Sequence, residues 1–238
     1  VDQYGMSRKV WRNLASSADV MSVALSAAVT KLDAAFCARF EAIKAKEMSA
    51  SKSAQQSKRN PGCTAIVGLL WGDRLCVANA GDCRAILSRD GVALPLSVDH
   101  DAESNASERH RIERDFPGAL RQHNGVWRVG DAGVAVTRAI GDADAKAFGV
   151  VAEPEMTTVS VNLATDDCLV LACDGLWDVV DNHDALAMIK DTVKEPSMCA
   201  KRLGCEALTR LSGDNVTVLV GFLRGNRTCE NVSWARAF

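Results

Sequence analysis

Four aspartates in this chain stand beside glycines at the ends of short apolar runs. Asp82 follows "VANAG", Asp174 follows "LVLAC", Asp214 precedes "NVTVLVGF", and Asp142 follows "VAVTRAIG". Because glycine lets the backbone turn sharply, a short carboxylate at each strand end can point toward a common centre. Asp-Gly is also a common turn signal, so each position taken alone has a plain turn as its alternative. Taken as a set, the carboxylates indicate a site for a hard ion such as Mg²⁺ or Mn²⁺.

The composition is that of a soluble globular protein. Of the 238 residues, 47% are hydrophobic and 24% are charged, and the net charge is −2. This charge gives no basic field for nucleic acid, and no apolar run reaches the roughly 18 residues that span a bilayer. We therefore expect neither a nucleic-acid nor a membrane partner, and a monomer.

One domain is expected over residues 1–224, followed by an irregular tail over 225–238, with no linker long enough to divide the chain. The first residue is not Met, and we expect the chain to have been cut from inside a longer sequence.

The nine cysteines are odd in number and contain no CxxC pair. Disulfide frameworks and zinc sites need tighter patterning than this. We interpret the thiols as reduced, small core residues. Reduced thiols are typical of a reducing compartment, so the expected location is cytoplasmic or nuclear.

The hydrophobic pattern predicts strands and helices that are grouped apart. Residues 20–47 lack Gly and Pro, and they place Leu25, Leu32, Phe36, Phe40 and Ile43 on one helical face. The other predicted helices are 107–115, 182–193 and 197–211, the last with Ser197 as its N-cap. The predicted strands are 64–70, 74–80, 84–88, 134–137, 157–161, 169–173 and 216–222. This grouping favours an α+β layered domain over alternating βαβ units.

A series of sequence blocks resembles the metal-dependent protein serine/threonine phosphatases of type 2C, in that family's order, from about residue 62 to 223. The blocks are "GCTAIVGLL" (62–70), "VANAGDCRAIL" (77–87), "LSVDHDAE" (96–103), Glu108 with Arg111-Ile112, "AVTRAIGDADAK" (135–146), "VVAEPE" (150–155), "LVLACDGLWDVV" (169–180) and "GDNVTVLV" (213–220). The resemblance implies an antiparallel β-sandwich flanked by helices on both faces, a four-layer α-β-β-α fold that here lacks its first strands.

The resemblance also implies a site for two Mg²⁺ or Mn²⁺ ions, with a third, weaker ion beside them. Asp174 and Asp214 would bind one ion, and Asp82 would help to hold the third beside Asp174.

The N-terminal "VDQYGM" is aligned with the family's Asp-Gly-His-Gly-Gly motif, the alternative being an unrelated stub with a chance aspartate. In this alignment Asp2 is the aspartate that bridges both metals, and Gln3 supplies a backbone carbonyl ligand. Tyr4 replaces the histidine proposed as general acid. Because tyrosine has an ordinary pKa near 10, it donates a proton poorly at neutral pH. General acid catalysis contributes typically about 10²–10⁴-fold, so a large loss of rate is compatible with residual activity.

The implied function is hydrolysis of phosphoserine and phosphothreonine in a phosphoprotein substrate, by a hydroxide that bridges the metals. The alternative is a pseudophosphatase that keeps the fold and binds a partner, such as a kinase or phosphoprotein. Trp71 and Trp177 are expected to pack in the core rather than to stack on substrate.

Overall fold

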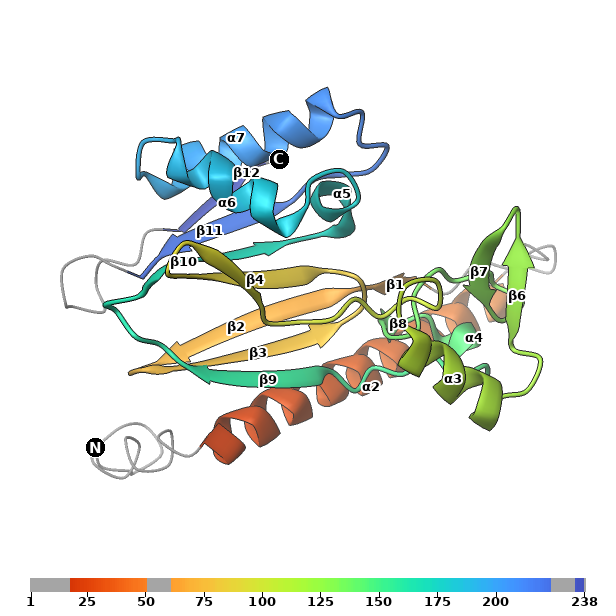
Figure 1. The fold of residues 1–238 in the computed structure, drawn as a ribbon. Coiled ribbons are helices and arrows are strands. Elements are labelled where there is room, and N and C mark those ends of the chain that lie inside the picture. Colours follow the sequence, from red (N-terminus) through yellow and green to blue (C-terminus); the bar gives the residue numbers. More distant parts are fainter. Residues whose placement is uncertain (1–17, 51–60, 224–233, 238) are drawn as a thin grey trace.

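The computed structural model describes residues 18–50, 61–223 and 234–237. These form antiparallel sheets with helices outside them, so the predicted α+β class is confirmed (Figure 1). The helices are α2 (Ala18–Ala50), α3 (Ala106–Asp115), α4 (Ala143–Lys146), α5 (Asp174–Trp177), α6 (Asn182–Lys190) and α7 (Pro196–Thr209). The strands are β1 (Gly62–Cys63), β2 (Ala65–Trp71), β3 (Arg74–Ala80), β4 (Arg84–Arg89), β5 (Val92–Pro95), β6 (Leu120–His123), β7 (Val126–Val129), β8 (Ile140–Gly141), β9 (Glu155–Ser160), β10 (Asp166–Ala172), β11 (Val218–Phe222) and β12 (Trp234–Ala237).

Two sheets lie against each other and enclose an apolar layer. One has five strands in the order β12-β11-β10-β4-β5, and the other has three in the order β2-β3-β9. Because successive side chains of a strand alternate between faces, one face of each sheet supplies the layer. Leu75 and Val77 of β3 meet Leu87 of β4 and Leu169 of β10 there, and all four are almost fully buried.

Helices α5, α6 and α7 cover the outer face of the five-stranded sheet (Figure 1). The opposite faces of β10 and β11 present Val170 and Val220 to Leu186 of α6 and Leu203 of α7. Trp177 is also buried in this layer, as predicted, and its indole Nε1 donates a hydrogen bond to the carbonyl of Ala172 at 3.0 Å. Burial of this layer fixes the position of α5, which carries Asp174.

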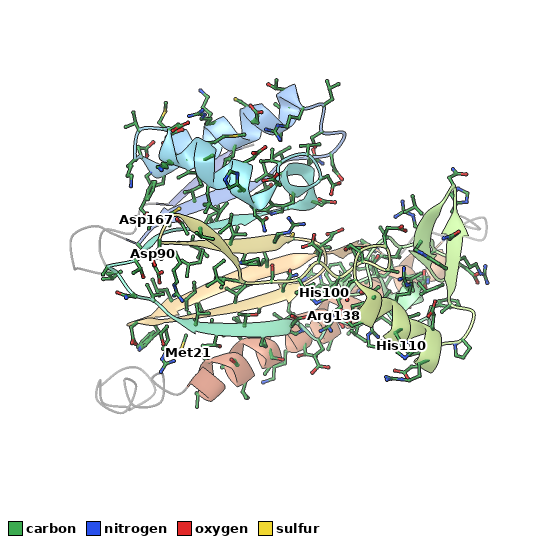
Figure 2. All side chains as sticks on the ribbon, viewed as in Figure 1. Met21, Asp90, His100, His110, Arg138 and Asp167 are labelled. Carbon is green, nitrogen blue, oxygen red and sulfur yellow. The ribbon has the colours of Figure 1, made fainter. Side chains whose placement is uncertain are left out.

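Helix α2 lies along the outer face of the three-stranded sheet, where it contacts β3 and β9 (Figure 1). The residues that it buries there are Met21 and Val29, and Figure 2 labels Met21 near the first turns of the helix. The predicted apolar face is therefore wrong in part, because Leu32 is 57% exposed and Phe36 and Ile43 are exposed as well. The sheet contacts the neighbouring stripe of the helix, in which residues recur four apart.

The same helix corrects the expectation that no segment is long enough to span a bilayer. Val20–Lys46 contains an 18-residue window with a mean hydropathy of 1.5 and passes that test by length and composition. Ser22 donates or accepts hydrogen bonds with Cys76 Sγ at 3.5 Å and Thr158 Oγ1 at 3.1 Å, so one side of α2 is bound to the sheet.

A third apolar cluster lies beyond the end of the sheets, in a unit made of α3, α4 and the hairpin β6–β7 (Figure 1). Its centre is formed by Ile112, Val129 and Val150, which are fully or almost fully buried. The short strands β1 and β8 connect this unit to the β-sandwich, and they pair with Gly62 opposite Gly141.

Several element predictions are corrected by the structure. Residues 134–137 form isolated bridges, at Val134 and Val136, instead of a strand. The N-cap of α7 is Glu195 rather than Ser197, because the Glu195 carboxylate accepts hydrogen bonds from the backbone amides that follow Pro196. Trp71, expected in the core, is 45% exposed.

Part of the tail expected to be irregular forms the strand β12. Its residues pair with β11 in an antiparallel register that joins Val218 to Ala237 and Gly221 to Trp234.

Candidate metal centre

Asp82, Asp174 and Asp214 lie at the same end of the five-stranded sheet. Asp82 precedes β4, Asp174 follows β10, and Asp214 precedes β11. Because β4 and β11 both pair antiparallel with β10, the start of each lies beside the end of β10. Sheet pairing therefore brings together three carboxylates that are distant in the sequence.

The charges of these aspartates act on one another. Burial and then the charge of Asp174 raise the pKa of Asp82 to about 6. Burial is also the main cause that raises the pKa of Asp174, and the charge of Asp214 adds to it. Among the described residues, no lysine or arginine forms an ion pair with any of the three. The cluster is therefore an uncompensated negative centre, which a bound cation would stabilise.

Asp174 is fixed by the turn from β10 into α5. Its carboxylate Oδ1 accepts a hydrogen bond from the backbone amide of Gly175 at 2.9 Å. Gly175 lies so close to the Asn215 carbonyl that a Cβ at this position would overlap it. Ser212 Oγ also donates a hydrogen bond to the carbonyl of Gly175 at 2.7 Å. Only glycine fits here without moving the segment that carries Asp214.

The loop before β11 is joined to the end of β10 by Cys173. Its Sγ donates a hydrogen bond to the Asn215 carbonyl at 3.1 Å and accepts one from the Thr217 amide at 3.2 Å. The backbone amide of Asn215 donates to Asp214 Oδ1 at 2.6 Å. These bonds connect the positions of Asp174 and Asp214 through short backbone segments.

The turn that carries Asp82 is built on the buried side chain of Asn79. Its amide nitrogen donates to the carbonyls of Gly81 at 2.9 Å and Val98 at 3.0 Å. The Gly81 amide donates to His100 Nδ1 at 3.3 Å. Gly81 has a φ of 125° and lies against Thr64, where a Cβ would overlap the threonine side chain. The turn can therefore reach the end of the sheet only with glycine before Asp82.

Two further aspartates, Asp99 and Asp178, belong to the same electrostatic environment, and sequence reasoning did not find them. Burial and then the charges of Asp174 and Asp99 raise the pKa of Asp178. Asp99 accepts two hydrogen bonds from Arg84, at 3.1 Å and 2.6 Å. Asp178 follows Asp174 by one helical turn, and this spacing is the signal that could have revealed it.

Asp142 has the same glycine-aspartate pattern, but its neighbours are Gly62 and Lys146 rather than the other three aspartates. Its carboxylate lies against Gly62, and its pKa is raised by burial while the nearby charge of Lys146 lowers it. A cleft of about 800 Å³ opens beside it, lined by residues 131–134, 142–145 and 147–148. The predicted set of four aspartates is thus divided into a cluster of three and a separate position.

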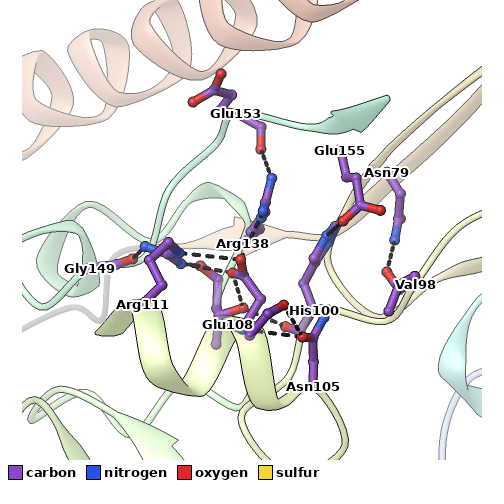
Figure 3. Close-up of polar contacts among 12 residues, drawn as sticks. Asn79, Val98, His100, Asn105, Glu108, Arg111, Arg138, Gly149, Glu153 and Glu155 are labelled. Atoms are coloured by element: carbon purple, nitrogen blue, oxygen red, sulfur yellow. Dashed lines mark hydrogen bonds and ion pairs between the residues drawn. The ribbon is translucent and has the colours of Figure 1, made fainter. Parts of the chain in front are cut away.

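A buried ion-pair network joins the sandwich to the α3 unit (Figure 3). Glu108 accepts hydrogen bonds from Arg111 and Arg138, both at 2.8 Å, and from Thr137 Oγ1 at 2.7 Å. Burial alone would raise the pKa of Glu108, but these donors outweigh it and hold the pKa at about 2. Figure 2 labels Arg138 beside His100, whose Nε2 lies 3.1 Å from a Glu155 carboxylate oxygen.

Asp181, His183 and Asp184 form a second group whose ligand atoms lie within 4.8 Å of one another. Asp181 and His183 are exposed, and Asp181 already accepts a hydrogen bond from the Asp184 amide as the N-cap of α6. Asp184 also pairs with Arg210 at 2.9 Å. These contacts explain the arrangement without an ion.

The N-terminal residues predicted for the site lie outside the described part of the chain. They are Asp2, predicted to bridge the metals, Gln3, predicted to offer its carbonyl, and Tyr4 at the general-acid position.

Residues 6–216 match the model of the family described as Protein phosphatase 2C. A "Protein kinase and PP2C-like domain-containing protein" of Oryza sativa subsp. japonica is 50% identical over 76% of this chain, and one of Arabidopsis thaliana is 46% identical over 88%. The matches span 27% and 30% of those proteins' own lengths. The crystal structure of serine-threonine phosphatase 2C from Toxoplasma gondii has a TM-score of 0.72 at 22% identity, covering 87% of this chain and 68% of that one. The last similarity shows a shared fold.

Proposed function

Because the chain belongs to the protein phosphatase 2C family, we propose that it catalyses the metal-dependent hydrolysis of phosphoserine and phosphothreonine in proteins. The observation that carries this proposal is the convergence of Asp82, Asp174 and Asp214 at one end of the five-stranded sheet. Their charges repel, and burial raises the pKa values of Asp82 and Asp174. Such a cluster opposes folding unless a cation neutralises it.

The donor set fits Mg²⁺ or Mn²⁺, because these hard ions prefer carboxylate oxygens. We assign Asp174 and Asp214 to one ion and Asp82 with Asp174 to a further, weaker one, with Asp2 and the Gln3 carbonyl completing the centre. Ions of this kind, when bound, lower the pKa of water and offset charge on phosphoryl oxygens.

The residues of this chain would hold the reacting groups in place. The Gly175 amide orients the Asp174 carboxylate, and the Cys173 contacts hold the segment that carries Asp214. No protein nucleophile is required, since the carboxylates act as ligands. In the alignment made from the sequence, Tyr4 would stand at the position of the proton donor for the leaving alkoxide, and its high ordinary pKa predicts a slow rate for that step.

The test is the hydrolysis of a phosphothreonine peptide by the full chain, with Mn²⁺ and with EDTA. We expect turnover that requires Mn²⁺ and falls at least about 100-fold in Asp174→Asn. Asp184→Asn, which alters the half-buried partner of Arg210 on α6, is the matched control and should retain turnover. Turnover that survives both EDTA and Asp174→Asn would contradict the proposal.

A phosphoprotein-binding module without catalysis is the second candidate. Gln3, Tyr4 and Met6 favour it, because they replace residues of the family's Asp-Gly-His-Gly-Gly motif. The similar plant proteins are named for a kinase as well as a PP2C-like domain. Tyr4→His separates the two candidates. A gain in turnover supports the enzyme, whereas binding of the phosphopeptide without turnover in both forms supports the module.

A further inference from the structure

Two cysteines directly flank the clustered aspartates. Cys83 follows Asp82 and Cys173 precedes Asp174. Strands β4 and β10 pair antiparallel with Arg84 opposite Ala172, so the next step of the same register sets Cys83 opposite Cys173. Opposite residues of an antiparallel pair project from the same face of a sheet. Both thiols therefore lie at the end of the apolar layer between the sheets.

The backbone geometry at this pair suits a disulfide. Ala85 directs its backbone N–H to Ser97 Oγ and its carbonyl to the Leu96 amide, away from β10, so Arg84 holds a hydrogen-bonded position and the next pair, Cys83 with Cys173, continues the ladder at a non-hydrogen-bonded one. Cα atoms at such positions are about 4.5 Å apart, and disulfides join Cα atoms separated by about 4.4–6.8 Å. A bond between the two sulfurs is therefore possible without separating or shifting the strands.

The two thiols are reduced, and their sulfurs have other partners. Cys83 Sγ lies 3.4 Å from Thr64 Oγ1, while Cys173 Sγ contacts the Asn215 carbonyl and the Thr217 amide. To form a bond, each side chain must turn about χ1. Cys83 is buried and Cys173 is half-buried, so Cys173 is the thiol that a small oxidant reaches first.

We propose that Cys83 and Cys173 form a redox modification site whose reactant is a hydroperoxide, with hydrogen peroxide as the simplest case. The Cys173 sulfur attacks one peroxide oxygen, an S–O bond forms, the O–O bond breaks, and water leaves. The Cys83 sulfur then attacks the Cys173 sulfur, an S–S bond forms, the S–O bond breaks, and a second water leaves with the Cys83 proton. The two thiols lose two electrons and the peroxide gains them.

Oxidation removes a contact that positions the metal centre. When Cys173 Sγ turns toward Cys83, it leaves the Asn215 carbonyl and the Thr217 amide. The segment that begins at Asp214 then loses its side-chain contacts with Cys173, while the ladder of β10 with β11 and the bond from the Cys173 amide to the Thr217 carbonyl remain. This consequence, unlike the disulfide itself, rests on the proposed function, and it predicts Mn²⁺ binding about 10-fold weaker, which corresponds to about 1.4 kcal/mol.

The experiment treats the full chain with hydrogen peroxide, then unfolds it, blocks remaining thiols and digests it with trypsin without reduction. Cleavage at arginine and lysine leaves Cys76 with Cys83 in one peptide and Cys168 with Cys173 in another. We expect these two peptides to be cross-linked with the loss of two hydrogens, and dithiothreitol to separate them. The cross-link should persist in Cys76→Ser and Cys168→Ser and be lost in Cys83→Ser. Fragment spectra of the unmutated peptides assign the bond even where a variant does not fold.

Mass mapping and Mn²⁺ calorimetry answer separate questions. Full alkylation of Cys83 and Cys173 after peroxide, with oxidation confined to exposed thiols such as Cys63 and Cys205, would overturn the proposed site whether or not the chain is a phosphatase. If the cross-link forms but Mn²⁺ affinity is unchanged, the proposed effect on the metal centre is overturned. Failure of the phosphatase assay alone changes neither readout.

Discussion

Gly175 and Asn215 touch so closely that no Cβ fits between the two backbones, and these residues directly follow Asp174 and Asp214. Neighbouring backbones therefore set the separation of the two candidate ligands. Long side chains have many rotamers, whereas a backbone contact inside a paired sheet has few alternatives. The ladder between β10 and β11 thus fixes the relative position of Asp174 and Asp214.

This contact predicts that Gly175→Ala will disturb the metal centre. The added methyl group must push the Asn215 carbonyl away, and overpacking of this kind costs typically about 1–3 kcal/mol. We expect a corresponding loss in the free energy of unfolding and weaker Mn²⁺ binding by calorimetry. Gly213→Ala is the matched control, because a Cβ there meets nothing within 4 Å. If the two variants had equal free energies of unfolding and equal Mn²⁺ affinities, the contact would not be what positions Asp214.

A second prediction concerns the pH dependence of the metal-free protein. Folding raises the pKa of Asp82 from 3.8 to about 6, by burial and by the charge of Asp174, with smaller effects of Asp99 and Asp178. The folded chain thus keeps this proton up to a higher pH than the unfolded chain does. Stability from this group is full below pH 4 and is lost as the pH rises through about 6.

Asp82→Asn should remove this loss of folding stability at neutral pH, because asparagine carries no charge to bury. In EDTA at pH 7 we expect the variant to be more stable than the parent by roughly 2 kcal/mol, after allowance for solvent screening. In saturating Mn²⁺ the order should reverse, because the parent gains binding energy that the variant lacks. Denaturant unfolding at pH 5 and pH 7 measures both effects, with the exposed Asp144→Asn as control. A parent that is already the more stable protein in EDTA at pH 7 would disprove the repulsion.

The cluster of Asp82, Asp174 and Asp214 could be predicted in part from the sequence, because each of these aspartates stands beside a glycine at the end of an apolar run. Asp142 shows the limit of that reasoning. It carries the same pattern, yet the strand before it, β8, pairs with β1 rather than with the five-stranded sheet. The local sequence of a strand does not specify which other strand it pairs with. Asp178 was missed for the opposite reason, since it is the C-cap of α5 and does not stand at a strand end.

The strands β2, β3, β4, β9, β10 and β11 were all expected within a few residues of their observed bounds. The buried face of α2 could not be predicted because apolar residues occupy more than one stripe of the helix, and only the sheet decides which stripe is covered. The strand β12 was missed because it depends on pairing with β11. Local propensity therefore predicts the elements, and tertiary pairing selects their partners.

A third prediction follows from the buried carboxylate of Glu108. Its folded pKa of about 2 lies below the ordinary value of 4.5, so it contributes stability that is present above pH 4.5 and is lost as the pH falls toward 2. The difference of pKa corresponds to roughly 3 kcal/mol. Glu108→Gln leaves Arg111 and Arg138 without their shared carboxylate and should lose a similar amount at pH 7.

Urea unfolding at pH 7 and pH 3 provides the measurement. The deficit of Glu108→Gln relative to the parent should be large at pH 7 and smaller at pH 3, where the parent itself begins to lose the interaction. Glu113→Gln, on the exposed side of the same helix α3, should differ little from the parent at either pH. A deficit that does not change with pH would assign the loss to packing instead of charge.

The last prediction concerns Arg84, which joins the acidic end of the sheet to α5 and α6. Its guanidinium makes two hydrogen bonds to Asp99, donates to Asn182 Oδ1 at 3.0 Å, and lies 5.4 Å from the ring centroid of Trp177. Lysine cannot make the bidentate pair and the stacked contact together. Arg84→Lys should therefore lower the free energy of unfolding by about 1–2 kcal/mol. Arg121→Lys, at an ion pair in which both side chains are more than 60% exposed, should cause no measurable change in the same denaturation assay. If Arg84→Lys lowered the free energy of unfolding no more than Arg121→Lys does, Arg84 would act only as a point charge beside Asp99.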